Sequence, residues 1–248
     1  MRFKDKVVII TGGASGIGEE TTVAFAGEGA YVVVADFSEE KGRELTERLN
    51  SGNHRAHFIK TDVTKEDDVI AMVKECTEHF GRVDVLFANA GMAHDSPIVE
   101  LRLEDWQKTI DVNLTGVFLC CKHVIRQMLR QGGGGTIVNC GSIHSHVGKG
   151  GVTAYAASKG GVKLLTQTLC ADYAQHGIRV NAICPGYIDT PLLKHLPIYA
   201  KQQLVKLHPQ GRLGRADEVA SVVLFLASDD ASFVNGTTIL VDGGYTTL

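Results

Sequence analysis

The chain has 248 residues, of which 44% are hydrophobic and 21% charged, and its formal net charge is -3. This balance excludes a disordered or coiled-coil chain, and 25 basic against 28 acidic residues argue against a nucleic-acid or membrane-surface partner. A chain of this length can bury a core without disulfides or metals. Only glycine stands out, with 28 residues, or about 11% where roughly 7% is usual.

Short β-branched runs alternate with longer helical patterns along the whole chain. The predicted strands are 6–10, 30–35, 57–59, 83–88, 136–140, 179–183 and 238–241. The predicted helices run from the first glycine-rich stretch to about 28 and then over 39–49, 65–80, 103–129, 154–175 and 217–227. Uniformly hydrophobic strands separated by helices predict a parallel sheet covered on both faces. We therefore expect one α/β domain over 1–248, a three-layer doubly wound Rossmann fold with a mainly parallel seven-stranded sheet.

Nothing in the sequence suggests export or membrane insertion. The apolar run after Lys6 stops at Gly12, too short for a signal-peptide core. No apolar stretch approaches the ~18 residues of a membrane span. The six cysteines include no CxxC pair, which favours reduced, buried thiols. We expect a cytoplasmic protein without a membrane partner and, since no His/Cys/Asp set has ligand spacing, without a catalytic metal.

The glycine-rich stretch between the first strand and the first helix stands where dinucleotide-binding turns occur. Its spacing is G-x-x-x-G-x-G over Gly12, Gly16 and Gly18, with Ser15 and Ile17 between them. Missing side chains allow a tight turn and close approach to a pyrophosphate, and the helix N-terminus offers N–H donors. The pattern predicts a nucleotide site.

Asp36 ends the second strand, 18 residues after Gly18. A carboxylate there accepts hydrogen bonds from an adenosine ribose and repels a 2′-phosphate. Phe37 follows instead of a basic residue, and the glycine-rich stretch holds no Lys or Arg. These residues favour NAD over NADP, although Asp36 alone could be an ordinary strand-end or helix-cap aspartate.

Tyr155 and Lys159 are four residues apart in the predicted helix 154–175, so both side chains project from one helix face. A phenol ionises at about pH 10, too high for a base at neutral pH, but an adjacent ammonium stabilises the phenolate. Ser142 follows the fifth strand, where the ligand crevice of an open α/β sheet lies, and its hydroxyl could hold a substrate oxygen. A Tyr/Lys pair alone is usually a surface contact; together with Ser142 and a nucleotide turn it predicts acid–base chemistry.

Over essentially its whole length the chain resembles the short-chain dehydrogenase/reductase family, of the compact single-domain kind. The matching motifs are Thr11-Gly12, Gly16-Ile17-Gly18, Asp62-Val63, Asn89-Ala90-Gly91, Asn113, Ser142, Tyr155 to Lys159, Pro185-Gly186 and Asp242-Gly243-Gly244. The resemblance implies hydride transfer between nicotinamide and a secondary alcohol or ketone. Sugars, polyols, cyclic alcohols and hydroxysteroids are all compatible substrates.

The resemblance also implies a role for each matched position. Tyr155 would be the acid–base group, and Lys159 would hold the nicotinamide ribose and favour the phenolate. Ser142 would orient the substrate oxygen, while Asn113 would anchor a water in a proton relay with Lys159. The other cofactor positions would be Asp62, Val63, Asn89, Ala90, Gly91, Pro185, Gly186, Ile188 and Thr190.

The substrate side is less defined. His144 stands where family members often have a small residue; it could line the substrate pocket and donate to a polar substrate oxygen. Alternatively, and slightly more in keeping with a loop, it faces solvent or a neighbouring subunit. His94 is a second candidate at the pocket edge. The segment 189–209 would be a substrate lid, and its mixed composition names no particular alcohol.

Two other functions fit the same residues. One is an NADPH-dependent 3-oxoacyl thioester reductase, against which Asp36 argues. The other is a non-catalytic NAD-binding sensor, which need not retain Asn113, Ser142, Tyr155 and Lys159 together. The family further implies a homotetramer in which the helices 103–129 and 154–175 pair with symmetry mates.

Overall fold

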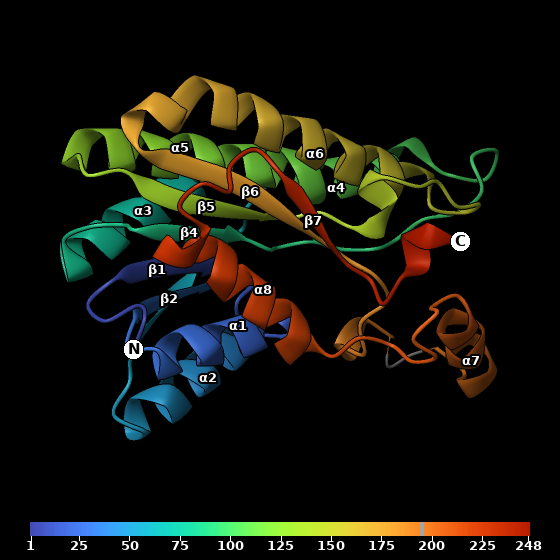
Figure 1. The fold of residues 1–248 in the computed structure, drawn as a ribbon, viewed down its shortest axis with the longest axis horizontal. Coiled ribbons are helices and arrows are strands. Elements are labelled where there is room, and N and C mark those ends of the chain that lie inside the picture. The colour runs from blue at the N-terminus through green and yellow to red at the C-terminus, as the bar shows by residue number, and fades with distance from the viewer. Residues whose placement is uncertain (194–195) are drawn as a thin grey trace.

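A seven-stranded parallel sheet forms the centre of the computed structural model, which describes residues 1–193 and 196–248. The strand order is β3-β2-β1-β4-β5-β6-β7 (Figure 1). The strands are β1 (Val7–Thr11), β2 (Tyr31–Asp36), β3 (Arg55–Lys60), β4 (Val85–Ala88), β5 (Gly135–Cys140), β6 (Ile178–Pro185) and β7 (Thr238–Val241). The doubly wound Rossmann fold predicted from the sequence is confirmed.

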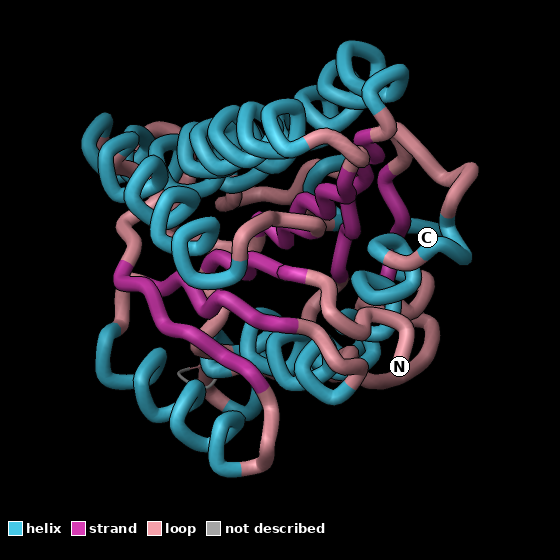
Figure 2. The backbone as a smooth tube through the Cα atoms, turned by 90° about the vertical axis from the view of Figure 1, so that its left-hand side faces the viewer, coloured by secondary structure: helices cyan, strands magenta, loops and turns pink. Residues whose placement is uncertain are grey.

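Helices cover both faces of this sheet. One face carries α1 (Gly16–Gly27), α2 (Glu39–Ser51) and α8 (Ala216–Ala227). The other carries α3 (Glu66–Phe80), α5 (Gly116–Gln131) and α6 (Thr153–Tyr173), with α4 (Leu103–Ile110) leading toward α5. Figure 2 shows the sheet between these two helical layers, and α7 (Ile198–Lys206) stands apart from them in Figure 1.

The two cores follow from the strand periodicity. In β1, Val7 and Ile9 join the core beneath α3, α5 and α6, whereas Val8 and Ile10 join the core beneath α1 and α8. Because both faces are covered, every residue of β1 is buried. This explains why the strand reads as a continuous apolar run rather than an alternating one.

Two elements differ from the sequence prediction. The helix expected over 103–129 is divided by a π-helical segment, Asp111–Thr115, which places the side chain of Asn113 in the interior. The segment 189–209, for which no helix was predicted, contains α7; because none of its residues is buried, no apolar periodicity indicates a helix there. Lys194 and His195 of that predicted lid lie outside the described residues. Among the described helices, none is long and apolar enough to cross a membrane.

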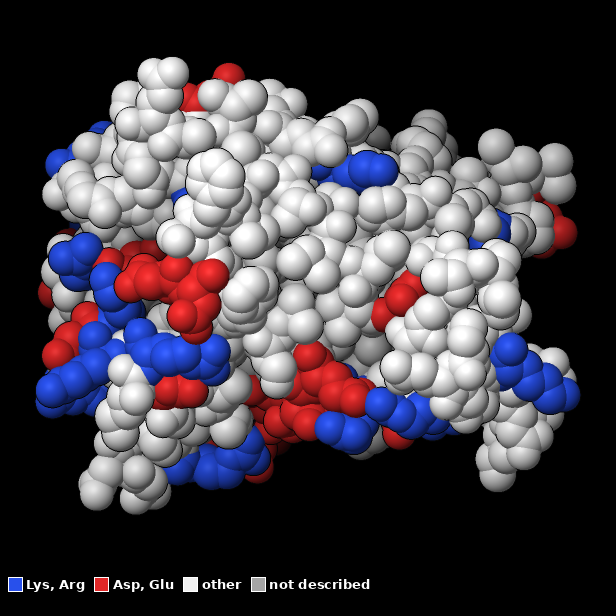
Figure 3. Space-filling view, in the orientation of Figure 1, with Lys and Arg blue, Asp and Glu red and all other residues white. Residues whose placement is uncertain are grey.

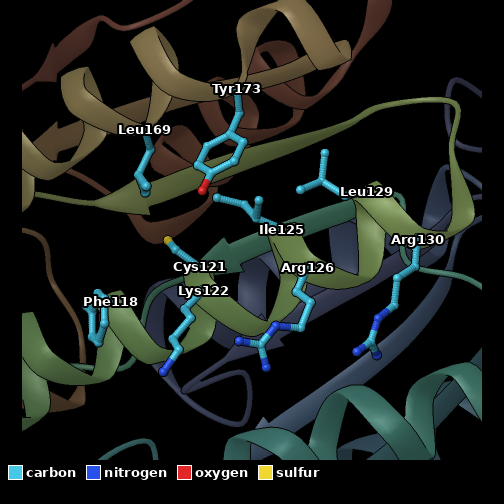
Figure 4. A pocket seen from close by; sticks show the side chains of 9 residues that line it. All are labelled: Phe118, Cys121, Lys122, Ile125, Arg126, Leu129, Arg130, Leu169 and Tyr173. Carbon is cyan, nitrogen blue, oxygen red and sulfur yellow. The ribbon is translucent and has the colours of Figure 1, made fainter.

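An apolar groove opens on the surface between α5 and α6 (Figure 4). It has a volume of about 480 Å³ and is lined by Phe118, Cys121, Ile125, Leu129, Leu169 and Tyr173, with Lys122, Arg126 and Arg130 along α5. Three large apolar residues on these helices are well exposed: Phe118 at 44%, Leu129 at 43% and Leu164 at 63%. In Figure 3 the face over α6 and β7 carries few charges, whereas charged side chains gather over α1, α2 and one end of α8.

The strand order positions the site. β1 lies between β2 and β4, so the chain direction across the sheet reverses at β1 and β4. Ligands of open α/β sheets bind outside the carboxyl ends of the strands at such a switch point. Four segments lie at this edge. They are the glycine-rich stretch 12–18 after β1, here called the glycine turn, the loop after β4, Ser142 after β5, and Pro185 at the end of β6.

Candidate active site

The glycine turn is tightly closed and tied to the neighbouring strand. Gly12 has a φ of 61°, and a Cβ on Gly18 would collide with the carbonyl oxygen of Gly12. The Asn89 Nδ2 donates to the carbonyl oxygens of Thr11 and Gly12, both at 3.1 Å. The Thr11 hydroxyl in turn accepts the backbone N–H of Asn89 at 3.0 Å. The predicted residue Asn89 therefore holds the turn against the end of β4.

A cavity of about 940 Å³, here called the acidic cavity, opens beside the glycine turn. Eight of the predicted cofactor residues line it: Gly12, Ser15, Asp36, Phe37, Asp62, Val63, Ala90 and Gly91. Its wall carries four carboxylates and one ammonium, from Asp36, Asp62, Glu104, Asp111 and Lys108. This wall gives the cavity a negative potential.

Backbone donors fix two of those carboxylates. The Asp36 oxygens accept the backbone N–H of Ala14 at 3.0 Å and of Ser38 at 2.9 Å. Burial opposes ionisation of Asp62, but hydrogen bonds from the hydroxyl and backbone N–H of Thr64 outweigh it and hold its pKa below the ordinary value. Both groups therefore present negative charge to the cavity.

A second cavity of about 370 Å³, here called the serine–tyrosine cavity, contains the predicted reactive groups. Ser142, His144 and Tyr155 line it together with the predicted cofactor residues Ile17, Pro185, Gly186, Ile188 and Thr190. The Ser142 Oγ accepts the backbone N–H of His144 at 3.1 Å. Because that bond occupies a lone pair, the hydroxyl hydrogen of Ser142 stays available to donate to a bound oxygen.

Lys159 lies behind Tyr155 on the same helix face. Its side chain is only 3% exposed, and its Nζ donates to the Cys140 carbonyl at 2.7 Å. The Nζ lies 5.6 Å from the centre of the Tyr155 ring. The structure thus brings an ammonium close to the phenol, as the spacing of the two residues predicts.

Asn113 connects the loop after β4 to α6. It is buried; its Oδ1 accepts the backbone N–H of Met92 at 2.8 Å, and its Nδ2 donates to the Met92 carbonyl at 2.9 Å. The Nδ2 also lies 3.3 Å from the Ser158 Oγ, which itself donates to the Tyr155 carbonyl at 2.7 Å. Asn113 therefore fixes the loop beside the helix turn that carries Tyr155.

The structure decides where the two candidate histidines lie. His144 is 7% exposed and belongs to the wall of the serine–tyrosine cavity, so the solvent-facing interpretation is wrong. Its Nδ1 lies 3.0 Å from the Val147 carbonyl, an acceptor, so Nδ1 carries the hydrogen. The side chain of His94 is 67% exposed beside Asp105 and does not line either cavity.

Sequence reasoning missed three residues around the serine–tyrosine cavity. The Asp95 Oδ2 accepts the backbone N–H of Tyr155 at 2.7 Å. Tyr187 and Tyr245 stand edge-on to the His144 ring, with ring centres 6.3 and 6.4 Å away. Both tyrosines directly follow glycine turns, a position that could have marked them; the Asp95 contact spans 60 residues of sequence and leaves no such signal.

The chain is similar to known proteins over nearly its whole length. Residues 12–246 match a family model described as Enoyl-(Acyl carrier protein) reductase. A cis-4-hydroxycyclohexanecarboxylate dehydrogenase of Sinomonas cyclohexanicum is 45% identical over 98% of both chains. A 3-oxoacyl-[acyl-carrier-protein] reductase of Thermotoga maritima is 42% identical over 98% of this chain and 99% of its own.

Two further proteins, one known from its sequence and one from its crystal structure, are similar over nearly the whole chain. A cyclohexanol dehydrogenase of an Acinetobacter species is 40% identical over 99% of this chain and 96% of its own. The crystal structure of a levodione reductase superposes with a TM-score of 0.95, at 38% identity and 99% coverage of both chains.

Proposed function

The chain belongs to the short-chain dehydrogenase/reductase family of oxidoreductases, and from this we propose that it transfers a hydride between NAD and a secondary alcohol or ketone on a small ring. The observation that carries the proposal is the serine–tyrosine cavity, where Ser142 and Tyr155 line one space and Lys159 lies behind the phenol. Relatives named for cyclohexane alcohols support a ring over an open-chain substrate.

A nicotinamide dinucleotide fits the described residues. The glycine turn contributes Gly12 and Ser15 to the acidic cavity and Ile17 to the serine–tyrosine cavity, so it lies along both. Any side chain at Gly18 would collide with the Gly12 carbonyl oxygen, so the tight turn requires glycine at this position. When bound, the dinucleotide supplies or accepts the hydride.

The acidic cavity supports NAD over NADP. Four carboxylates face one ammonium in its wall, and Asp36 is held there by two backbone N–H donors. A 2′-phosphate would add negative charge beside the fixed Asp36 carboxylate, and Lys108 is the one basic residue among the described lining residues, against four carboxylates. Phe37, which follows Asp36, supplies no positive charge.

The protein residues divide the proton chemistry among them. The Ser142 hydroxyl donates to the substrate oxygen, and Tyr155 takes the alcohol proton during oxidation or returns it during reduction. Lys159 stabilises the phenolate through its buried positive charge. Asn113 keeps the loop after β4 in register with α6 and would anchor the water of the proton relay. Apolar groups such as Ile143, Ile188 and Leu193 limit water in the cavity.

Initial rates test this function against the thioester-reductase alternative, which the Thermotoga relative represents. The purified protein is offered NAD and NADP with cyclohexanol, a sugar, a polyol and a hydroxysteroid. In parallel it is offered NADH and NADPH with an acetoacetyl thioester. We expect NAD-dependent oxidation of the ring alcohol. Preferred reduction of the thioester with NADPH would overturn both the substrate and the cofactor proposal.

We further propose that 1–248 acts as one domain and assembles as a homotetramer in the cytoplasm. The apolar groove between α5 and α6 and the exposed Phe118 and Leu164 support pairing of these helices with second copies. All six cysteines are free thiols, which supports a reducing compartment. Light scattering tests the assembly, and a stable monomer would contradict it.

A further inference from the structure

The described residues that line the serine–tyrosine cavity include one negatively charged side chain and no positively charged one. Of its described lining residues, Asp95 alone carries a charged side chain. The rest of the wall is apolar, aromatic, hydroxyl or backbone, from residues such as Ser142, Tyr187 and Leu196. A bound substrate therefore faces a fixed carboxylate, and no lysine or arginine of the described ranges 1–193 and 196–248 lines the cavity.

Each oxygen of the Asp95 carboxylate accepts one backbone N–H. One oxygen accepts the Tyr155 backbone N–H at 2.7 Å, and the other accepts the Ser96 backbone N–H at 3.0 Å. Two N–H donors, one on each oxygen, fix the orientation of the Asp95 side chain. Each oxygen keeps a lone pair that can accept a further hydrogen bond, for example from a hydroxyl in the cavity.

His144, the one histidine among the described lining residues, does not supply a positive charge. His144 donates from Nδ1 to the Val147 carbonyl at 3.0 Å, and burial lowers the pKa of its imidazole, an effect that the nearby Lys149 reinforces. Its Nε2 is the one buried side-chain nitrogen or oxygen of the described residues with no hydrogen-bond partner. A neutral imidazole with an unshared lone pair adds an acceptor to this region rather than a cation.

Two lysines of the described residues have contacts with residues of the cavity wall, but neither lines the cavity itself. Lys159 lies behind Tyr155 and donates to Cys140, outside the lining of the cavity. Lys149 is exposed, donates to the Tyr187 hydroxyl at 2.7 Å and is likewise absent from the lining. Solvent screens an exposed charge of this kind.

From this arrangement we propose that the cavity selects an uncharged, hydroxyl-bearing ring alcohol and rejects a ring alcohol that carries a carboxylate, and that Asp95 is the specificity-determining residue. The proposal rests on the proposed dehydrogenase function and sets this chain apart from its relative named for cis-4-hydroxycyclohexanecarboxylate. A carboxylate on the ring would lose hydration and lie near the Asp95 charge without a lysine or arginine among the described lining residues, while the Ser142 and Tyr155 hydroxyls are engaged by the reacting oxygen.

The test uses one pair of isosteric substrates. Rates of NADH formation are measured with cis-4-hydroxycyclohexanecarboxamide and with the corresponding carboxylate, and the readout is the ratio of their kcat/KM values. We expect the wild type to prefer the neutral amide by roughly 3- to 100-fold, the range for two like unit charges about 6 Å apart when the effective dielectric constant lies between about 80 and about 20. A ratio of one, or a preference for the carboxylate, overturns the proposal.

Variants separate the charge of Asp95 from its structural bond. Asp95→Asn removes the charge, keeps a carbonyl oxygen for the Tyr155 N–H and loses the acceptor for the Ser96 N–H. Because any loss of positioning lowers the rates with both substrates alike, the ratio is expected to come close to one. Asp105→Asn, which removes a carboxylate that lies beside His94 outside the cavity, should leave the wild-type ratio unchanged. An unchanged ratio in Asp95→Asn overturns the assignment.

A binding measurement keeps this inference distinct from the function on which it rests. Calorimetry compares cyclohexanecarboxamide with cyclohexanecarboxylate on the wild type and Asp95→Asn, both saturated with NADH. Turnover of cyclohexanol with equal affinity for the two ligands means that the charge inference fails and the dehydrogenase function stands. No turnover of any ring alcohol means that the proposed function fails, and equal affinities then overturn the charge inference as well.

Discussion

Asn113→Ala should cost both stability and turnover, because this buried side chain joins two parts of the site. It makes three hydrogen bonds, two with the Met92 backbone and one with the Ser158 hydroxyl. At roughly 0.5–1.5 kcal/mol each, their loss removes roughly 1.5 to 4.5 kcal/mol from the free energy of unfolding. For a chain of this length each kcal/mol lowers Tm by roughly 2 to 4 °C, so the expected fall is roughly 3 to 18 °C.

The effect on turnover follows from where those bonds lie. Met92 and Asp95 lie three residues apart in the loop after β4, and the Asp95 carboxylate accepts the backbone N–H of Tyr155. Releasing this loop misplaces the phenol and the cavity wall, and a misplacement of about 1 Å costs on the order of 100-fold in rate. We expect kcat to fall by that order while the affinity for NAD changes much less.

Asn139→Ala is the matched control for this prediction. Asn139 is also buried, donates to the Thr166 hydroxyl at 3.0 Å and accepts from the Cys121 thiol at 3.4 Å. Its loss should lower Tm through the same kind of broken bonds but leave kcat unchanged well below the transition. Calorimetric melting and steady-state rates measure both quantities. An unchanged Tm in Asn113→Ala, or an equal loss of kcat in the control, would refute the reasoning.

Three further predictions address single groups. Tyr155→Phe should abolish turnover and leave NAD affinity, measured by calorimetry, nearly unchanged; surviving turnover would exclude Tyr155 as the acid–base group. Asp36→Asn removes a charge from the acidic cavity and should raise the NADP-to-NAD ratio of kcat/KM by roughly tenfold or more. Asp230→Asn, in an exposed 3-10 helical segment away from that cavity, should leave the ratio unchanged. Burial raises the pKa of Cys76 and of Cys120 to about 12, so at about pH 8 an alkylating reagent should modify only the partly exposed Cys170 in the native protein. Mass spectrometry reads this out, and rapid labelling of the other thiols would contradict it.

The parts of the fold that could be predicted are those whose sequence pattern has one physical cause. Strands such as β1 are apolar throughout because both faces of the sheet are covered. The glycine turn was visible because its backbone geometry demands glycine at Gly12 and Gly18. In contrast, α7 buries none of its residues, and the π-helical segment 111–115 has the same residue pattern as the α-helices that flank it.

The candidate site divides in the same way. Ser142, Tyr155 and Lys159 could be placed because helix spacing and strand ends fix their positions relative to the sheet. The burial of His144 could not, since it depends on three tyrosine rings that come from separate segments of the chain. In the sequence Asp95 resembles an ordinary turn aspartate, two residues before Pro97. Only the tertiary structure brings it to the backbone of α6.

The tie between Asn89 and the glycine turn has a consequence for protein engineering. Because the carbonyls of Thr11 and Gly12 are bonded to the end of β4, the dinucleotide half of the crevice is braced by the sheet itself. The substrate half depends on other segments, chiefly the loops 93–96 and 143–152, together with Leu193 and Leu196 beyond the cofactor positions Ile188 and Thr190. Sequence diversity confined to those segments should retarget the enzyme to new ketones without the retuning of coenzyme affinity that often accompanies directed evolution.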